Sequence, residues 1–296
     1  MSRLAPHFRE LQARFQSSAK AGAVSAGVPG TSFFWVANEV PRAPLLYSAG
    51  IVIIGQGYKV GYLGDRAFRY DEDTYLVVGV PMPFECETHP AKSGPLLGLR
   101  IDIDITALHA LVASLGSKTN RSDETGPPSG LEPVKMNEEM IEATIRLVNC
   151  LRDPIDSKVL GPSMVNEIIY RVLRGEQGRV LYSLTQHSTP YAAIARALDR
   201  IHSDYREALT VESLAEENAM SVSSFHRTFK RVTGDSPLQY LKKIRLDKAK
   251  GLLVHQGMRV NSVAYEVGYE SPSQFSREFK RYFRVPPSEA QDLAYN

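Results

Sequence analysis

The sequence predicts an α+β protein with more than one domain, in which a β-rich first part is followed by helices and an all-α last part. Strand-like runs occupy residues 28–104, helical periodicity begins near Thr106, and one basic helical stretch occurs twice near the C-terminus. The chain has 296 residues, of which 43% are hydrophobic and 23% charged. This length and composition suit two ordinary soluble domains, each with its own core.

The β-rich part contains several short runs of β-branched and aromatic residues, among them "FFWVANEV", "LLYSAGIVIIGQG", "KVGYLGDRAFRY" and "TYLVVGV". Gly64-Asp65 predicts a tight hairpin between two of them. Many short strands joined by close turns are typical of a small barrel or sandwich, which we place at residues 28–115. Residues 1–27 are predicted to form a helical arm, because apolar residues recur there at helical spacing.

Helices are predicted after the barrel, with one interruption. The stretch "GSKTNRSDETGPPSGLEP" is polar and rich in Gly and Pro, which predicts a mobile loop. Helical segments "MNEEMIEATIRLVNCL" and "PSMVNEIIYRVLRG" follow, and Gly175 is a predicted helix end. Residues 116–189 are therefore expected to hold a loop and then a helical linker or dimerisation segment, and residues 190–296 a separate helical domain.

The repeated stretch lies in this last domain. "SSFHRTFKRVTGDSP" at residues 223–237 and "SQFSREFKRYFRVPP" at residues 273–287 share seven identical positions. In each copy the aromatic residues recur at helical spacing and predict a buried face. The outward face carries polar and basic residues that can reach base edges and phosphates. The candidate DNA-binding residues are Ser223, Ser224, His226, Arg227, Lys230, Arg231, Ser273, Gln274, Ser276, Arg277, Lys280 and Arg281.

Each copy is preceded by a short helix and a tight turn, and its own helix begins at a capping serine, Ser221 or Ser271. This order predicts two helix-turn-helix units. The amphipathic stretch "SPLQYLKKIRLDKAKGLLV" between them would hold both units at a fixed separation. Residues 221–259 also contain nine Lys or Arg against two Asp, a local excess of positive charge that suits nucleic acid.

Several side chains in the two copies allow two interpretations. Gln274 is either a base contact or the second half of a capping box with Ser271. Arg227 and Arg277 either contact DNA or form salt bridges that fix the helix, and His226 is an outward residue that could contact a base. The four basic residues that follow a buried Phe are predicted to contact phosphates or to remain solvated: Lys230, Arg231, Lys280 and Arg281.

The residues "SFHRTFKRVTGDSPLQYLKKIRLDKAKGLLV" and "VAYEVGYESPSQFSREFKRYF" resemble the AraC/XylS family of transcription regulators. The stretch "QGYKVGYLGDRAFRYDEDTYLVVGVPMPFECET" is similar to the cupin-like N-terminal domain of one branch of that family. The resemblance implies a cupin-like barrel that senses a signal or dimerises, and a C-terminal domain that binds double-stranded promoter DNA. It further implies an activator that is not an enzyme, with RNA polymerase, a small-molecule effector and a second copy of the chain as partners.

One position departs from the family pattern. The family has Gly after the second recognition helix, and this chain has Arg284 there, although Gly234 keeps the pattern in the first copy. A left-handed conformation at a residue other than Gly costs about 1 kcal/mol. Arg284 could offset that strain by meeting a phosphate, or the turn could differ.

The β-rich part offers little for metal or thiol chemistry. His89 is the only histidine among the strand residues, with His109 in the following helix, and one isolated histidine does not make a metal site. The cysteines Cys86 and Cys150 are far apart, so neither a metal, a cofactor nor a disulfide is expected. Glu85 and Glu87 beside Cys86 would raise the pKa of its thiol, which favours a structural cysteine over a thiol sensor. A metal-free barrel would hold a small organic ligand or a packed core used for dimerisation.

The alternative from another class is an enzyme or a small-molecule-binding barrel whose helical tail serves protein assembly. The longest apolar run, near residues 49–54, is much shorter than the roughly 18–20 residues of a membrane span. The N-terminus carries charges of both signs and lacks the apolar core of a signal peptide. We therefore expect a cytoplasmic protein without membrane contact.

Overall fold

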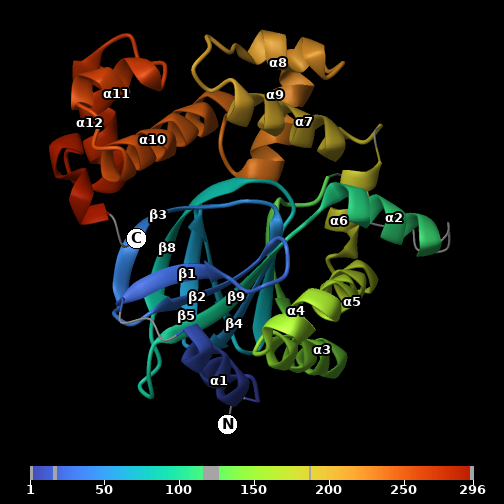
Figure 1. Ribbon diagram of the computed structural model, residues 1–296. Coiled ribbons are helices and arrows are strands. Elements are labelled where there is room, and N and C mark those ends of the chain that lie inside the picture. Colours follow the sequence, from blue (N-terminus) through green and yellow to red (C-terminus); the bar gives the residue numbers. More distant parts are fainter. Residues whose placement is uncertain (1–2, 16–18, 116–126, 187, 294–296) are drawn as a thin grey trace.

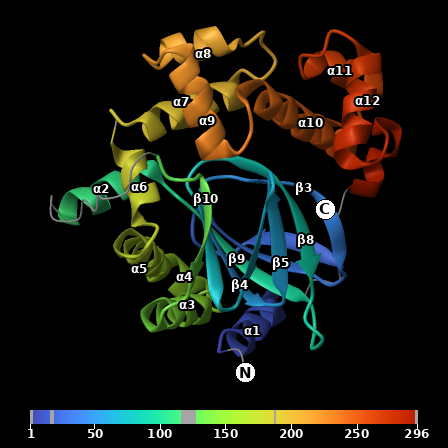
Figure 2. The ribbon, with the colours of Figure 1, turned by 180° about the vertical axis from the view of Figure 1, so that it is seen from behind.

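The computed structural model describes residues 3–15, 19–115, 127–186 and 188–293. Two β-sheets enclose a central core, and helix α1 closes one end of it (Figure 1). Helices α7 to α12 lie across the opposite end, and α3, α4 and α5 form a group beside the sheets, as the reverse view also shows (Figure 2). This arrangement confirms the predicted α+β architecture.

The strands are short, as expected. In chain order they are β1 (Ala21–Ser25), β2 (Thr31–Val36), β3 (Val40–Tyr47), β4 (Gly50–Gln56), β5 (Tyr58–Leu63), β6 (Arg66–Asp71), β7 (Thr74–Val78), β8 (Met82–His89), β9 (Leu96–Asp102) and β10 (Leu131–Lys135). One sheet has the order β1-β2-β9-β4-β7-β10 and the other β3-β8-β5-β6, with antiparallel pairing. Leu63 pairs with Arg66, so Gly64-Asp65 forms the predicted two-residue hairpin, with a positive φ of 60° at Gly64.

The helices are α1 (Ala5–Phe15), α2 (Ile105–Leu115), α3 (Glu138–Cys150), α4 (Pro154–Val159), α5 (Gly161–Arg174), α6 (Gly178–Thr185), α7 (Pro190–Ser203), α8 (Val211–Glu217), α9 (Val222–Thr233), α10 (Pro237–His255), α11 (Val260–Glu266) and α12 (Pro272–Phe283), followed by the 3-10 helix η2 (Pro287–Leu293). Helix α5 ends at Gly175, as its sequence predicts. In the part of the chain that the structure describes, no helix combines the length and the apolar character needed to cross a bilayer.

Two local predictions were wrong. Of the described residues in the expected helical arm at 1–27, those of α1 are helical, whereas Ala21–Ser25 forms β1 instead. Its five residues pair with β2. The ring of Trp35 packs directly over Gly22, where an added Cβ would lie only 2.6 Å from Cζ2 of the ring. Ala21–Ser25 forms a strand because the hydrogen bonds to β2 stabilise it, and the local sequence has no helical pattern that would compete.

The second wrong prediction concerns the expected loop before α3. Residues 116–126 of that stretch lie outside the described residues, but Leu131–Lys135 forms the edge strand β10. Leu131 and Val134 are buried, and Leu131 pairs with Val78 of β7. Pro133 is tolerated because β10 has a neighbour on one side only.

The buried residues form two hydrophobic clusters. The first extends from the sheets through α3 and α5 into α7, α8, α9 and the start of α10. The second contains the end of α10 with α11 and α12. We call α7, α8 and α9 the first unit, α11 and α12 the second unit, and α10 the linker helix. The first unit thus shares its core with the sheets, whereas the second unit has a core of its own.

Candidate nucleic-acid interface

Helix α9 contains the first copy of the repeated stretch and is the first candidate recognition helix. Its N-terminus is capped by Ser221, whose Oγ accepts a hydrogen bond from the backbone N–H of Ser224 at 3.3 Å. Phe225, Phe229 and Val232 are completely buried, as their helical spacing predicts. The helix ends at Gly234, which has a φ of 78°. The buried face therefore fixes which residues point outward.

Helix α12 repeats this design in the second unit. The Oγ of Ser271 accepts a hydrogen bond from the backbone N–H of Gln274 at 3.3 Å, and Pro272 occupies the first turn. Phe275, Phe279 and Phe283 form the buried face. Arg284 ends the helix with a φ of 68°, and its backbone N–H donates to Lys280. Of the two interpretations of Arg284, the left-handed turn is the one that the protein adopts.

All twelve candidate residues lie on α9 or α12. Ten of them are exposed: Ser223, His226, Arg227, Lys230, Arg231, Ser273, Gln274, Arg277, Lys280 and Arg281. Ser224 and Ser276 are half-buried beside the aromatic face. Among the described residues, neither Arg227 nor Arg277 forms an ion pair within 4.0 Å, so the structure gives no support to a role in fixing the helix.

Glu278 is a residue of this face that the sequence did not single out. Lys242 of the linker helix donates to its Oε1 at 2.9 Å, and the hydroxyl of Tyr269 donates to its Oε2 at 2.9 Å. The side-chain amide of Gln274 donates to Oε1 at 3.3 Å, so this amide points along α12 and not back to the capping position. Burial by itself raises the pKa of Glu278, but the hydrogen bonds from Lys242, Tyr269 and Gln274 outweigh it and lower that pKa.

These contacts hold Glu278 in place on the outward side of α12. Gln274, Arg277, Glu278 and Arg281 line a pocket of about 380 Å³ on the outward side of α12. The pocket combines an amide, a carboxylate and two guanidinium groups, which are the groups that hydrogen-bond to base edges and phosphates. An acidic residue within a basic helix, at the position of Thr228 in the first copy, was the sequence signal for Glu278.

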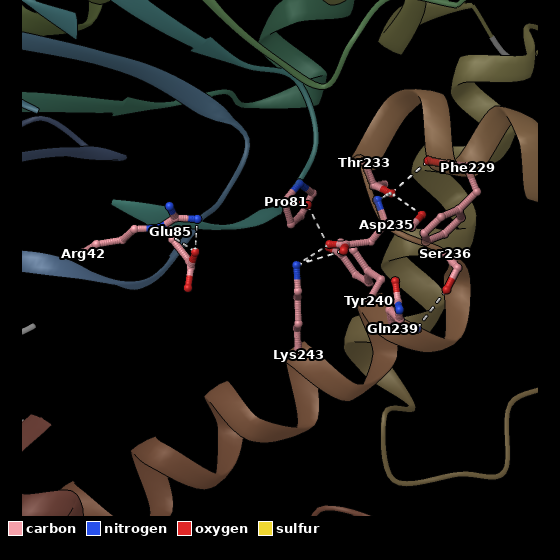
Figure 3. Close-up of polar contacts among 10 residues, drawn as sticks. All are labelled: Arg42, Pro81, Glu85, Phe229, Thr233, Asp235, Ser236, Gln239, Tyr240 and Lys243. Carbon is pink, nitrogen blue, oxygen red and sulfur yellow. Dashed lines mark hydrogen bonds and ion pairs between the residues drawn. The ribbon is translucent and has the colours of Figure 1, made fainter. Parts of the chain in front are cut away.

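Near the C-terminal end of the first recognition helix, the start of α10 is hydrogen-bonded to the segment between β7 and β8 (Figure 3). The hydroxyl of Tyr240, at the start of α10, donates to the backbone carbonyl of Pro81 at 2.7 Å, and the backbone N–H of Gly130 donates to Val232 at 2.9 Å. Nearby, Lys243 pairs with Asp235 at 2.7 Å. The orientation of α9 is therefore set partly by the N-terminal domain.

Tyr240 also receives a hydrogen bond from inside the first unit. Nε2 of His202 lies 2.8 Å from the Tyr240 hydroxyl. Since that hydroxyl gives its proton to a carbonyl, Nε2 is the donor of this second bond. Burial, with a smaller contribution from Lys248, lowers the pKa of His202 to about 4, so the ring is neutral at pH 7.

Cys86, the candidate thiol sensor, lies inside the barrel and is buried. Its Sγ is 3.4 Å from the hydroxyl of Tyr70. The pKa of Cys86 is raised, as its acidic neighbours suggested, but burial is the largest cause, and Lys59 and Tyr70 oppose it. The burial of Lys59, whose Nζ donates to Tyr47 at 3.1 Å, was not foreseen from the sequence.

The two histidines considered as metal ligands lie on different elements. His89 on β8 pairs with Glu39 at 2.8 Å and stacks on Tyr58, whereas His109 belongs to α2. Within the described ranges, no cluster of three or more His, Cys, Asp or Glu side chains is placed to hold a metal ion.

Comparisons with known proteins assign this architecture. The family described as "AraC-type transcriptional regulator N-terminus" matches residues 27–180, and the family "Helix-turn-helix domain" matches residues 214–292. ToxT from Vibrio cholerae has a similar fold, with a TM-score of 0.59 at 13% sequence identity over 89% of this chain and 97% of ToxT.

Two curated relatives are similar in sequence. The lactose operon transcription activator of Staphylococcus xylosus is 28% identical over 151 residues, which are 50% of this chain and 54% of the relative. An HTH-type transcriptional regulator of Haemophilus influenzae is 37% identical over 222 residues, which are 75% of this chain and 59% of the relative. The matches thus span little more than half of these relatives. Because the first family covers more than half of the chain and the helix-turn-helix family covers both recognition helices, the chain belongs to the AraC-type transcriptional regulators.

Proposed function

We propose that this protein binds double-stranded promoter DNA sequence-specifically and activates transcription, with α9 and α12 in two successive major grooves. The observation that carries the proposal is the repetition of one recognition-helix design at both ends of the linker helix. Each copy has a serine cap, a buried aromatic face and an exposed face of polar and basic side chains. A single basic helix would leave open a solvated surface, but two matching ones on a common linker favour paired grooves.

The two ends of each recognition helix have different roles in this proposal. The N-terminal turns carry Ser, His, Gln and Arg side chains, and in helix-turn-helix proteins this end of the helix contacts the bases. Lys230 and Lys280 lie further toward the C-terminal end, where side chains meet the phosphate backbone. Base contacts specify the sequence, whereas phosphate contacts position the protein and make binding depend on salt.

The partners beyond DNA belong to the same proposal. One ToxT structure holds (E)-4-(8-methylnaphthalen-1-yl)but-3-enoic acid, which makes a small organic effector the reasonable ligand class for the N-terminal domain here. The core shared by the sheets and the first unit would carry a change in the barrel to α9. A homodimer and RNA polymerase complete the expected partners of a cytoplasmic activator.

The test is selection of binding sites from random DNA, followed by affinity measurements at several salt concentrations. Lys230→Ala is expected to lower affinity for all sequences alike and to reduce the salt slope by roughly one. His226→Ala and Arg277→Ala are expected to change the preferred base at one position, each at a cost of about 1–3 kcal/mol. Lys92→Ala, which removes an exposed charge from the N-terminal domain, is the control and should change neither quantity.

Two results would contradict the proposal. If His226→Ala and Arg277→Ala keep the parental consensus at every base and lose only overall affinity, these residues do not contact bases. If the parental protein shows no steep dependence on salt and selects no sequence, the alternative of a barrel with an assembly tail is favoured.

A further inference from the structure

The linker helix carries one side chain that touches both units. Arg245 lies at the point where the buried face of α10 changes partners: Tyr240, Leu241 and Ile244 belong to the first hydrophobic cluster, and Leu246 begins the second. Helix α10 also connects the two units in space (Figure 1). Arg245 therefore occupies the boundary between the two cores.

The guanidinium of Arg245 donates three hydrogen bonds, each to a backbone carbonyl. Nε donates to Tyr205 at 2.7 Å and Nη2 to Glu207 at 2.8 Å, both in the loop between α7 and α8 of the first unit. Nη1 donates to Gly268 at 2.9 Å, in the turn of the second unit. We call Arg245, this loop and this turn the joint.

Gly268 shows how closely the joint is packed. Its φ is 85°, and a Cβ at this position would lie 2.6 Å from the carbonyl oxygen of Arg206 and 3.0 Å from the guanidinium of Arg245. Any other residue would thus meet both an unfavourable backbone conformation and a collision. The backbone of the turn in the second unit therefore packs directly against the backbone of the loop in the first unit.

Two further contacts cross the joint. Tyr205 packs against both hydrophobic clusters. Arg206 pairs with Glu266 of α11 at 2.7 Å, but both side chains are exposed, so this ion pair contributes little. Burial lowers the pKa of Arg245, with Tyr269 opposing it, yet a guanidinium stays charged at any working pH.

Lysine could not replace Arg245 here. A guanidinium presents its N–H groups in a planar fork, which suits three carbonyls on different segments, whereas the single nitrogen of lysine cannot reach all three. The substitution Arg245→Lys keeps the charge and most of the apolar stem, so it removes the joint with little other change.

We propose that the Arg245 joint holds the two recognition helices as one rigid body and thereby determines which spacing between DNA half-sites the protein accepts. Arg245 is a positioning residue in this role and does not itself contact bases. The inference rests on the proposed function, because spacing has meaning only if α9 and α12 enter two grooves.

Spacing is a sharp test of rigidity. One inserted base pair moves the second half-site by about 3.4 Å and rotates it by about 34°, since one turn of B-DNA contains about 10–10.5 base pairs. A rigid pair of helices cannot follow both changes and loses base contacts in one groove. We therefore expect an insertion or deletion of one base pair to weaken binding of the parental protein by about tenfold or more.

The experiment uses the full chain and the duplex that it selects from random DNA, resynthesised with one base pair added or removed between the half-sites. In Arg245→Lys the penalty for altered spacing should fall to about threefold or less, because a loosened second unit can turn to meet its half-site. Arg259→Lys is the matched control, since Arg259 is an exposed arginine at the N-cap position of α11 and outside the joint, and its penalty should equal that of the parent.

Three outcomes would overturn the inference. Arg245→Lys could keep the full spacing penalty, or it could lose affinity equally for all spacings, which would indicate a role in stability alone. Selection of a single half-site by the parental protein would refute the two-groove function as well, so the two failures can be told apart.

A measurement on the folded protein covers the case in which Arg245→Lys fails to fold. Spin labels at Glu216→Cys on α8 and Asn261→Cys on α11, both exposed positions outside the recognition helices, report the distance between the units. A rigid joint predicts one narrow distance distribution that DNA does not change. A broad distribution in the otherwise parental protein would contradict the inference without any change at Arg245.

Discussion

Replacing Arg284 by glycine should stabilise the protein. Arg284 ends α12 in the left-handed conformation, with a φ of 68°, where its first-unit counterpart Gly234 has 78°. This conformation costs a residue with a Cβ about 1–2 kcal/mol and costs glycine nothing. Glycine in turn costs about 0.4–1 kcal/mol through the greater freedom of the unfolded chain. Since the Arg284 side chain is exposed, Arg284→Gly should raise the free energy of unfolding by about 0.5–1 kcal/mol.

The assay is urea denaturation of the full chain followed by two signals. Far-UV circular dichroism reports the helices, and the fluorescence of Trp35 in β2 reports the N-terminal domain. The second unit has its own hydrophobic core, so Arg284→Gly should move the part of the circular-dichroism transition that comes from α11 and α12 to higher urea by a few tenths of 1 M and leave the Trp35 transition unchanged.

The matched control is Gly234→Ala at the end of the first recognition helix. A Cβ there would lie 3.0 Å from Cδ1 of Leu63, in addition to the strain of a positive φ. This substitution should destabilise the protein by about 1–2 kcal/mol or more, and it should also move the Trp35 transition because Leu63 belongs to the N-terminal domain.

A destabilising effect of Arg284→Gly would refute this reasoning, because it would mean that the side chain contributes more than the backbone conformation costs. Measurements of DNA affinity test separately whether Arg284 contacts a phosphate. If Arg284 meets a phosphate, Arg284→Gly should weaken binding to all sequences and reduce the salt slope by roughly one; an unchanged slope would exclude that contact.

Two further predictions concern the contact between the first unit and the sheets. Because the folded protein keeps the pKa of His202 near 4 while the unfolded chain binds a proton below about 6.5, the free energy of unfolding should fall as the pH drops through this window, by about 2 kcal/mol between pH 7 and pH 5. Urea midpoints at both pH values test this, and His202→Gln should lose that part of the difference; an equal difference in both proteins would show that His202 is not responsible. The fragment 190–296 should fold and bind DNA more weakly than the full chain, with a less stable first unit because Tyr240 and Val232 lose their partners Pro81 and Gly130. Circular dichroism and affinity for the selected duplex measure this, and a folded fragment without affinity for any promoter would contradict it.

The sequence alone determined the features that depend on short-range order. Phe225 and Phe229 recur at helical spacing, and Ser221 caps the helix through an amide three residues away, so the recognition helix can be recognised within a dozen residues. The same is true of the Gly64-Asp65 hairpin, where the turn residues themselves select the geometry. The outward position of the candidate DNA-binding residues follows from the same helical period.

The tertiary structure decided what depends on partners that are distant in the chain. Ala21–Ser25 and Leu131–Lys135 form strands because they pair with the edges of β2 and β7. No local pattern in either segment reveals this pairing. The sequence left two interpretations of Gln274, a base contact or a capping box. In the fold its side-chain amide donates instead to Glu278, which Lys242 holds in place.

Arg245 makes the distinction most clearly. In the sequence it is one of several basic residues of an amphipathic helix, and its charge there suggests nothing more than a solvated surface. The fold brings to it the carbonyls of Tyr205, Glu207 and Gly268, which lie 40, 38 and 23 residues away along the chain. Local spacing determines which face of a helix is buried, because that depends on the period of the helix alone. Which carbonyls the half-buried guanidinium of Arg245 meets depends on how three segments pack, and only the complete fold determines that.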